Sequence, residues 1–303
     1  MSIYFAIQSE SACVALAPPR SIRILRARHL GMCFGVRNAI TLACREAAAG
    51  PLTVLGDLVH NETVLADLRR RGVVIARDAA AVATPTVMIT AHGASRRAVG
   101  RVRERGLRVL EATCPLVRHA HRCVRELVAA GYHPVIVGHR DHVEVRGIIE
   151  DLDEFDMVLT PEDVAQLTAR AGFGVVAQTT QLIEKVRWLV ALIRQRFPQS
   201  DVQFADTVCQ PTKLRQAAAV EMARQSDVVI VIGGAQSNNT RELVATCRRF
   251  CEQVHHVQTS DDLQAEWFAD VATVGITAGT STPDAVIDAV ESRARELVER
   301  SDR

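Results

Sequence analysis

Three cysteines stand at positions where metal chemistry could begin. Cys33, Cys114 and Cys209 each lie directly before a segment with helix-like spacing, in GMCFGVRNAI, ATCPLVRHAH and TVCQPTKLRQ. A thiolate at the amino terminus of a helix is stabilised by the positive end of the helix dipole, which is expected to lower the thiol pKa and favour metal binding. Should the three sites converge, three thiolates without a fourth protein ligand would leave one iron of a cubane cluster open to substrate.

A lone cysteine is more often a small buried hydrophobe than a ligand. We interpret the remaining cysteines in this way: Cys13, Cys44, Cys123, Cys247 and Cys251. The chain has no CxxC pair, so the spacing alone names no metal. At this point both interpretations of the three helix-start cysteines stay open. Eight cysteines in a chain of this length, without the dense spacing of a secreted disulfide scaffold, favour a reducing cytoplasm.

The elements that must position these cysteines follow a repeated pattern. A short β-branched run, a polar or glycine-containing loop and an amphipathic helix recur six times, with strands predicted at Leu52–Leu58, Thr86–Thr90, Pro134–Gly138, Gly174–Ala177, Asp227–Ile232 and Thr273–Thr277. Strands alternating with helices predict an α/β fold with mostly parallel sheets. The polar loops follow the carboxyl ends of the strands, where ligands bind in open α/β sheets.

The cysteines divide this pattern into three similar α/β domains. Two units separate each pair of successive cysteines, and two more follow Cys209. We therefore expect an N-terminal extension at 1–21 and domains at 22–114, 115–208 and 209–303. Residues 22–32 could pack either with the first domain or with the third.

The bulk composition limits the classes of partner. Apolar residues make up 48% and charged residues 23% of the 303 residues, which is typical of a globular protein. A formal net charge of +1 gives no reason to expect nucleic acid or an anionic membrane as the main partner. The apolar runs are shorter than the roughly 20 residues that a membrane helix needs, and the first residues lack the basic start of a secretory signal.

Eight ordered motifs carry a family resemblance: GMCFGVRNA, LVHNETV, TAHGAS, EATCPLV, GHRDHVEV, AQTT, SNNT and TAGTSTPD. With them the chain resembles the 4-hydroxy-3-methylbut-2-enyl diphosphate reductase (LytB) family, from about Ile22 to about Val290. The resemblance implies the last step of the methylerythritol phosphate route to isoprenoids, which gives isopentenyl and dimethylallyl diphosphates. It also implies three α/β domains around a central iron-sulfur cluster.

The resemblance implies a role for each matching residue. Cys33, Cys114 and Cys209 would bind a four-iron, four-sulfur cluster. Glu144 would deliver a proton with the hydroxyl of Thr179 beside it. The residues matching the diphosphate pocket are His60, His92, His142, Thr179, Ser237, Asn238, Asn239 and Ser281. Histidine, serine, asparagine and backbone amides can bind a diphosphate without a large basic patch, which agrees with the low net charge. An external electron donor such as ferredoxin or flavodoxin is also implied, and the sequence has no Rossmann glycine fingerprint for a nicotinamide.

The chain departs from the family at three places. Val143 stands where the family has proline before the glutamate, and Gln210–Leu214 and Gln236–Asn238 differ from the usual sequences around the third cysteine and in the Asn-Ser-Ser-Asn motif. These changes leave two further hypotheses open. One is a divergent paralogue that reduces another allylic diphosphate, and the other is a non-catalytic iron-sulfur redox sensor. Retention of Glu144 and Thr179 argues against the sensor, which needs no proton donor.

Overall fold

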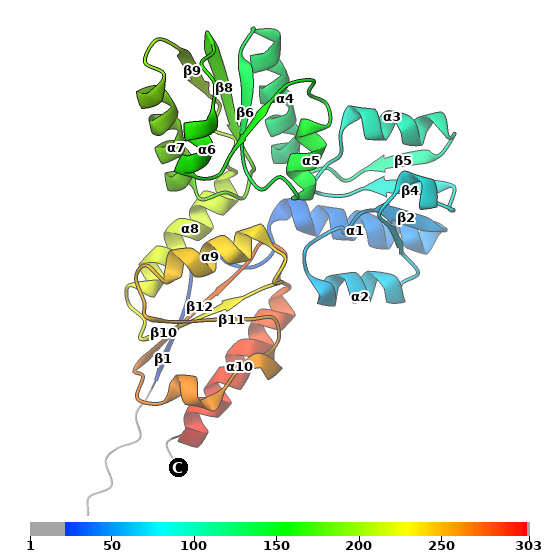
Figure 1. Ribbon diagram of the computed structural model, residues 1–303. Helices are drawn as coiled ribbons and strands as arrows, with labels where there is room; N and C mark the ends of the chain where they lie inside the picture. Colours follow the sequence, from blue (N-terminus) through cyan, green and yellow to red (C-terminus); the bar gives the residue numbers. More distant parts are fainter. Residues whose placement is uncertain (1–21, 302–303) are drawn as a thin grey trace, which may run out of the picture.

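The computed structural model describes residues 22–301. The predicted extension at 1–21 and residues 302–303 lie outside this range, as does Cys13. The described chain forms three four-stranded parallel sheets, each covered by helices, and the three units meet at a common centre (Figure 1). The predicted fold of three similar parallel α/β domains is confirmed.

The first sheet has the strand order β3-β2-β4-β5. Its strands are β2 (Leu52–Leu55), β3 (Val74–Ala76), β4 (Thr86–Ile89) and β5 (Arg108–Glu111). The helices of this unit are α1 (Phe34–Ala49), α2 (Glu62–Arg70) and α3 (Arg96–Glu104), with a short 3₁₀ turn, η1 (Ala79–Ala81). The apolar faces of α1 and α2 pack with β2 and β4 into one core, which includes Ala43, Val54, Leu68 and Met88.

The second sheet has the equivalent order, β7-β6-β8-β9. Its strands are β6 (His133–Val137), β7 (Asp156–Val158), β8 (Gly172–Ala177) and β9 (Asp201–Phe204). Its helices are α4 (Pro115–Ala129), α5 (Val143–Ile149), α6 (Pro161–Gln166) and α7 (Ile183–Arg196). Buried cores lie on both faces of the central strands, because β6 and β8 alternate their side chains between the two clusters.

The third sheet has the order β1-β12-β10-β11. Its strands are β1 (Arg23–Arg26), β10 (Val228–Ile232), β11 (Gln253–Val257) and β12 (Thr273–Ala278). Its helices are α8 (Gln210–Ala223), α9 (Asn238–Cys247) and α10 (Asp284–Ser301). Two 3₁₀ turns, η2 (Ser260–Asp262) and η3 (Ala265–Phe268), lie between β11 and β12. The strand β1 pairs with β12, so the start of the described chain closes the edge of the last unit before α1 enters the first. The domain boundaries themselves stay a prediction.

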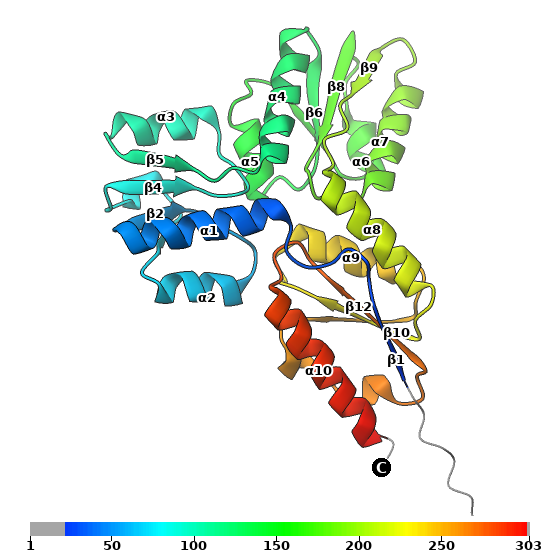
Figure 2. The same ribbon diagram turned by 180° about the vertical axis from the view of Figure 1, so that it is seen from behind.

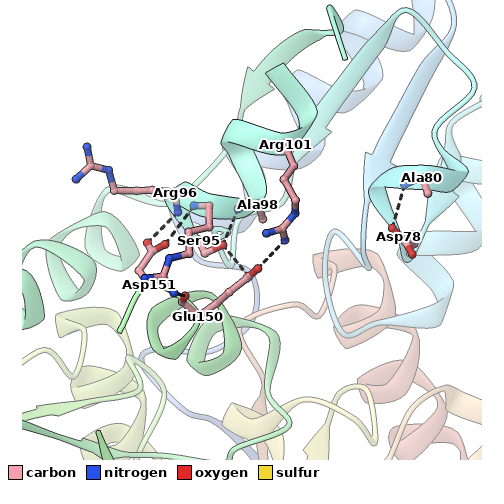
Figure 3. A network of polar contacts seen from close by, with 9 residues as sticks. Asp78, Ala80, Ser95, Arg96, Ala98, Arg101, Glu150 and Asp151 are labelled. Atoms are coloured by element: carbon pink, nitrogen blue, oxygen red, sulfur yellow. Dashed lines mark hydrogen bonds and ion pairs between the residues drawn. The ribbon is translucent and has the colours of Figure 1, made fainter. Parts of the chain in front are cut away.

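A polar network joins the first two units (Figure 3). Ser95 is the N-cap of α3 and donates its hydroxyl to Glu150 at 2.6 Å, while the backbone N–H of Arg96 donates to Asp151 at 2.8 Å. Arg101 donates to the other oxygen of Glu150, also at 2.6 Å. Because both acids follow α5, this network fixes α5 against the N-terminus of α3.

In the described residues, no helix is long and apolar enough to cross a membrane.

Candidate active site

Each of the three cysteines predicted as ligands is the N-cap of a helix. Cys33 precedes α1, Cys114 precedes α4 and Cys209 precedes α8. No thiol caps its own helix through a side-chain hydrogen bond. All three helices run outward from the centre of the molecule (Figures 1 and 2), so their positive ends point toward one place.

The thiols approach one another closely at this centre. The Sγ atoms of Cys114 and Cys33 lie 2.7 and 4.0 Å from the position that a Cβ would take at Gly35, so only glycine fits between them. The charge of Cys33 also raises the pKa of both Cys114 and Cys209. Yet among residues 22–301 no three His, Cys, Asp or Glu side chains are close enough to hold a single metal ion.

A buried cation lies beside two of these cysteines. Arg215 in α8 is 6% exposed and donates to the carbonyl of Gly31 at 2.5 and 3.2 Å and to that of Pro211 at 3.0 Å. Burial lowers its pKa, whereas Cys33 and Cys209 raise it. No carboxylate in the described part of the chain forms an ion pair with it. A buried charge needs a counter-charge, and thiolates holding an anionic cluster would supply it.

We predicted that the helix N-termini lower the thiol pKa. In the protein without metal, this prediction is wrong for Cys114 and Cys209. Burial raises the pKa of Cys114, and it raises the pKa of Cys209 to about 11 although Thr212 donates to that sulfur or accepts from it at 3.0 Å. Desolvation therefore outweighs the helix dipole and the hydrogen bond. Since thiols bind metal as thiolates, a positively charged metal has to displace these protons when it binds.

Three histidine rings meet in a second cluster. The ring centroids of His60 and His92 are 4.6 Å apart. The ring centroid of His142 lies 5.1 Å from that of His60 and 5.6 Å from that of His92. Burial lowers the pKa of His60, lowers that of His92 well below its usual value and lowers that of His142 to about 3. The rings are therefore neutral at physiological pH. His60 Nε2 and His92 Nδ1 are buried without a hydrogen-bond partner among the described residues, so two ring nitrogens remain available for a ligand.

Glu144 and Thr179 form a buried pair. The glutamate, at the start of α5, is 1% exposed, and it accepts from the backbone N–H of Thr179 at 2.6 Å and from its hydroxyl at 2.8 Å. Burial raises the pKa of Glu144 to about 7, while both hydrogen bonds oppose the shift. Its charge also raises the pKa of Cys114 and Cys209. The site thus holds a carboxyl group that can carry a proton near neutral pH, close to the cysteines.

The predicted polar residues of the third domain lie at the N-terminus of α9 and in the loop after β12. Ser237 caps α9 by accepting from the N–H of Thr240 at 3.3 Å, and Ser281 donates to the carbonyl of His60 at 3.3 Å. Asn239 accepts from the N–H of Thr280 at 3.0 Å, which leaves its buried Nδ2 without a partner in the described residues. Asn238 instead donates to Thr180 at 3.1 Å. Ser281 therefore links this group to the histidines.

A cavity of about 740 Å³ opens onto the histidines. His60 and His142 line it together with Gln236 and four arginines: Arg77, Arg140, Arg146 and Arg241. The sequence led us to expect a diphosphate site without a large basic patch, and these four arginines and Arg215 were missed. The sequence did contain a signal for Arg215. Together with Gln216 it matches an Arg-Gln pair that the family sequence has after the third cysteine. The cavity arginines have no motif of their own and are brought together only by the fold.

The fold and the site define a class: a protein of three parallel α/β units in which three helices begin near the centre, each directly after a cysteine. The LytB protein family matches residues 24–295. A 4-hydroxy-3-methylbut-2-enyl diphosphate reductase of Pelobacter propionicus is 36% identical over 278 residues, covering 91% of this chain and 99% of that protein. The reductase of Aquifex aeolicus is 36% identical over 284 residues, with 92% and 98% covered.

Two solved structures are similar as well. One is described as (E)-4-hydroxy-3-methyl-but-2-enyl diphosphate reductase, the terminal enzyme of the non-mevalonate pathway, and it matches with 35% identity and a TM-score of 0.65 over 91% of this chain and all of that one. The E-1-hydroxy-2-methyl-but-2-enyl-4-diphosphate reductase of Plasmodium falciparum matches with 25% identity and a TM-score of 0.82, covering 88% and 86%. The chain belongs to the LytB family, and the predicted family is confirmed. The family is one of iron-sulfur proteins.

Proposed function

We propose that this protein reductively removes the hydroxyl group of 4-hydroxy-3-methylbut-2-enyl diphosphate and releases isopentenyl and dimethylallyl diphosphates. The reaction breaks one C–O bond and forms one C–H bond, and it consumes two electrons and two protons with release of water. The observation that carries the proposal is the convergence of three N-cap cysteines beside the buried Glu144 and Thr179 pair. Membership of the LytB family and the names of its relatives support the same reaction.

Cys33, Cys114 and Cys209 would hold a four-iron, four-sulfur cluster with one iron free of protein ligands. When bound, such a cluster supplies electrons one at a time and a Lewis-acidic iron. The Arg215 guanidinium would balance part of the added negative charge, because it is buried near Cys33 and Cys209 and has no carboxylate partner among residues 22–301. Residue Gly35 keeps the space between two sulfurs open.

Glu144 would give its proton to the leaving hydroxyl group so that water departs. Its pKa of about 7 suits this task, since a general acid works best when its pKa lies near the working pH. Thr179 holds both carboxyl oxygens and so fixes the direction in which the proton is offered. A buried carboxyl group of this kind is hard to explain in a protein that only senses redox state.

The diphosphate would bind to the histidine cluster and to the start of α9. Within the described part of the chain, His60 and His92 offer unpartnered ring nitrogens and Asn239 offers an unpartnered amide, all from buried positions. Ser237, Ser281, His142 and Thr179 would complete the set, with Asn238 beside them. The helix N-terminus adds a positive electrostatic potential. The cavity arginines would attract the charged substrate to the mouth of the site.

A divergent paralogue remains the second candidate because of Gln236 and Asn238. Gln236 lines the cavity, and the Asn238 side chain is turned toward Thr180, so the surroundings of the substrate differ here from the family motif. The two candidates share the reaction and the cofactor. They differ only in which allylic diphosphate is turned over faster.

The proposal is tested by anaerobic purification, reconstitution of the cluster and turnover with a chemical reductant. We expect the C5 diphosphate to be converted to both products. A fully loaded protein that leaves this substrate unchanged would disprove the proposal, whereas faster turnover of another allylic diphosphate would favour the paralogue. The external donor would be a one-electron carrier such as ferredoxin or flavodoxin, and we expect the protein to work in the cytoplasm.

The ligand assignment has a separate test that does not depend on turnover. Serine at Cys33, Cys114 or Cys209 should remove most of the iron and the brown colour, because each loss leaves the cluster one ligand short. Serine at Cys44 or Cys123 serves as the matched control and should leave iron content unchanged. Equal iron in all five variants would contradict the assignment.

A further inference from the structure

A second cavity lies between the first two units of the fold. Its volume is about 810 Å³, and it is lined chiefly by α3 of the first unit and α4 of the second. It shares no lining residue with the cavity at the histidines. We name it the arginine cavity after five of its lining residues: Arg96, Arg97, Arg103, Arg118 and Arg125.

The spacing along the two helices explains why these residues meet. Each helix contributes three lining residues at intervals of three or four positions: Arg96, Gly100 and Arg103 from α3, and Arg118, His121 and Arg125 from α4. Positions with this spacing lie on the same side of a helix. Each helix therefore turns one basic side toward the cavity.

The positive charges in the arginine cavity exceed the negative ones. Glu111 is the one carboxylate among its lining residues, and it pairs with Arg103 at 3.2 Å. Arg97 pairs with Asp153 at 2.7 Å. The other three arginines have no ion-pair partner among residues 22–301: Arg96, Arg118 and Arg125. Cations that line one concave surface raise its positive potential and so favour an anion there.

A buried polar atom of the same cavity lacks a partner. His121 is 8% exposed, and its Nε2 has no hydrogen-bond partner in the described part of the chain. Burial lowers the pKa of this histidine, so the ring is neutral near pH 7 and can donate one N–H. A buried polar atom without a partner costs stability, which an oxygen of a bound ligand would restore. On the α3 side no atom lies within 4 Å of the position that a Cβ would take at Gly100, so this part of the cavity is open.

We propose that the arginine cavity binds a small molecule that carries a diphosphate group. Guanidinium groups bind phosphate oxygens through paired hydrogen bonds, and the three arginines without partners come from both helices. The volume lies within the range of small-molecule sites, roughly 300 to 1,000 Å³, and it leaves room for an organic part beside Val99. A nucleotide and an isoprenoid diphosphate share this chemistry. Either would link α3 to α4, next to the network that joins Ser95 to Glu150 (Figure 3).

The experiment measures binding of inorganic diphosphate, ADP and geranyl diphosphate to the cluster-loaded protein by anaerobic equilibrium dialysis without reductant. All proteins carry His92→Ala, which weakens binding at the histidine cluster. The combined Arg118→Gln and Arg125→Gln variant should bind all three probes about tenfold or more weakly, because it loses charge-assisted hydrogen bonds. Gly100→Leu keeps every arginine but fills the open space, and it should weaken ADP and geranyl diphosphate by about tenfold. Arg70→Gln, at a 76% exposed arginine of α2, is the control and should stay within about twofold.

The three probes separate the two sources of the diphosphate group. Tighter binding of ADP would identify a nucleotide, tighter binding of geranyl diphosphate an isoprenoid, and equal binding recognition of the diphosphate group alone. Each of these results supports the proposal when the cavity variants weaken it. Unchanged binding in both cavity variants would overturn the proposal, as would an equal loss in the control. It would also fail if none of the probes bound at millimolar concentration before the cavity is altered, since diphosphates would then bind at the histidines alone.

Discussion

Replacing Glu144 by glutamine removes the proposed proton and little else. The amide has the same size, and it can accept from the Thr179 N–H through its oxygen and donate to the Thr179 hydroxyl through its nitrogen. We therefore expect a normal iron content and a near-normal affinity for the diphosphate. The chemical step should slow by about 100-fold or more, which is the usual effect of removing a positioned general acid.

The pH dependence of the single-turnover rate should also change in the Glu144→Gln variant. The pKa of Glu144 is raised by burial to about 7, so the acid form is lost as the pH rises through this value. At pH 8 only about one molecule in ten keeps the proton, and the single-turnover rate of the parent should be roughly tenfold below its rate at pH 6. The glutamine variant has no group to titrate there, and its slow rate should be flat across this range.

Folding stability gives a second and independent measure of the same proton. The pKa of Glu144 in the folded state lies above the unfolded value of 4.5, so the folded chain keeps this proton up to a higher pH than the unfolded chain. The parent should therefore lose stability as the pH rises from 4.5 through 7, by about 3 kcal/mol in the free energy of unfolding relative to the glutamine variant. Urea unfolding of both cluster-free proteins at pH 5 and pH 8 measures this difference.

Two results would refute this reasoning. A loaded and substrate-bound glutamine variant that turns over at nearly the parental rate would show that the proton arrives by another path. A parent and variant whose urea midpoints move in parallel with pH would show that Glu144 is ionised in the folded state across this range. Single-turnover measurements with pre-reduced protein are required, because they isolate the chemical step from electron delivery.

Three further changes test other parts of the site. His92→Ala should weaken binding of the diphosphate by roughly 10- to 100-fold in calorimetry, because it removes one hydrogen bond to a charged group, with a smaller change in kcat. Arg215→Met should lower the reduction potential of the bound cluster by tens of millivolts, roughly, in a redox titration followed by electron paramagnetic resonance, and Arg215→Lys should restore most of it. Val143→Pro should raise the free energy of unfolding by about 0.4 to 1 kcal/mol, because residue 143 is the first of α5 and its N–H has no partner in the described chain.

The sequence predicted the centre of each sheet better than its edges. The six predicted strands correspond to β2, β4, β6, β8, β10 and β12, which are the two inner strands of the three sheets. Inner strands are buried on both faces and form continuous apolar runs such as Val228–Ile232. Edge strands are buried on one side only. A strand such as β9 therefore alternates polar and apolar residues, and it does so over just four positions. So short a pattern cannot be told from a loop without the neighbouring strand.

The family resemblance named the motif residues. Each of them follows a strand or begins a helix, and the fold brings such positions together. His60, His92 and His142 come from different loops and meet within 5.6 Å. The thiol pKa was predicted in the wrong direction because the sequence reveals the helix dipole but not the burial that opposes it. The roles carried by the family resemblance stay predictions until the variants are measured.

The formal net charge is only +1, but neutral and charged polar groups lie in different places around the centre of this molecule. Around the histidine cluster, buried neutral imidazoles and amides have no hydrogen-bond partner among residues 22–301. If the diphosphate binds there, as we propose, they can hold it without the cost of burying cations beforehand. Beside the thiols, the buried Arg215 forms no ion pair with a carboxylate among the described residues, so a cluster held by the cysteines, as we propose, would give this cation a counter-charge.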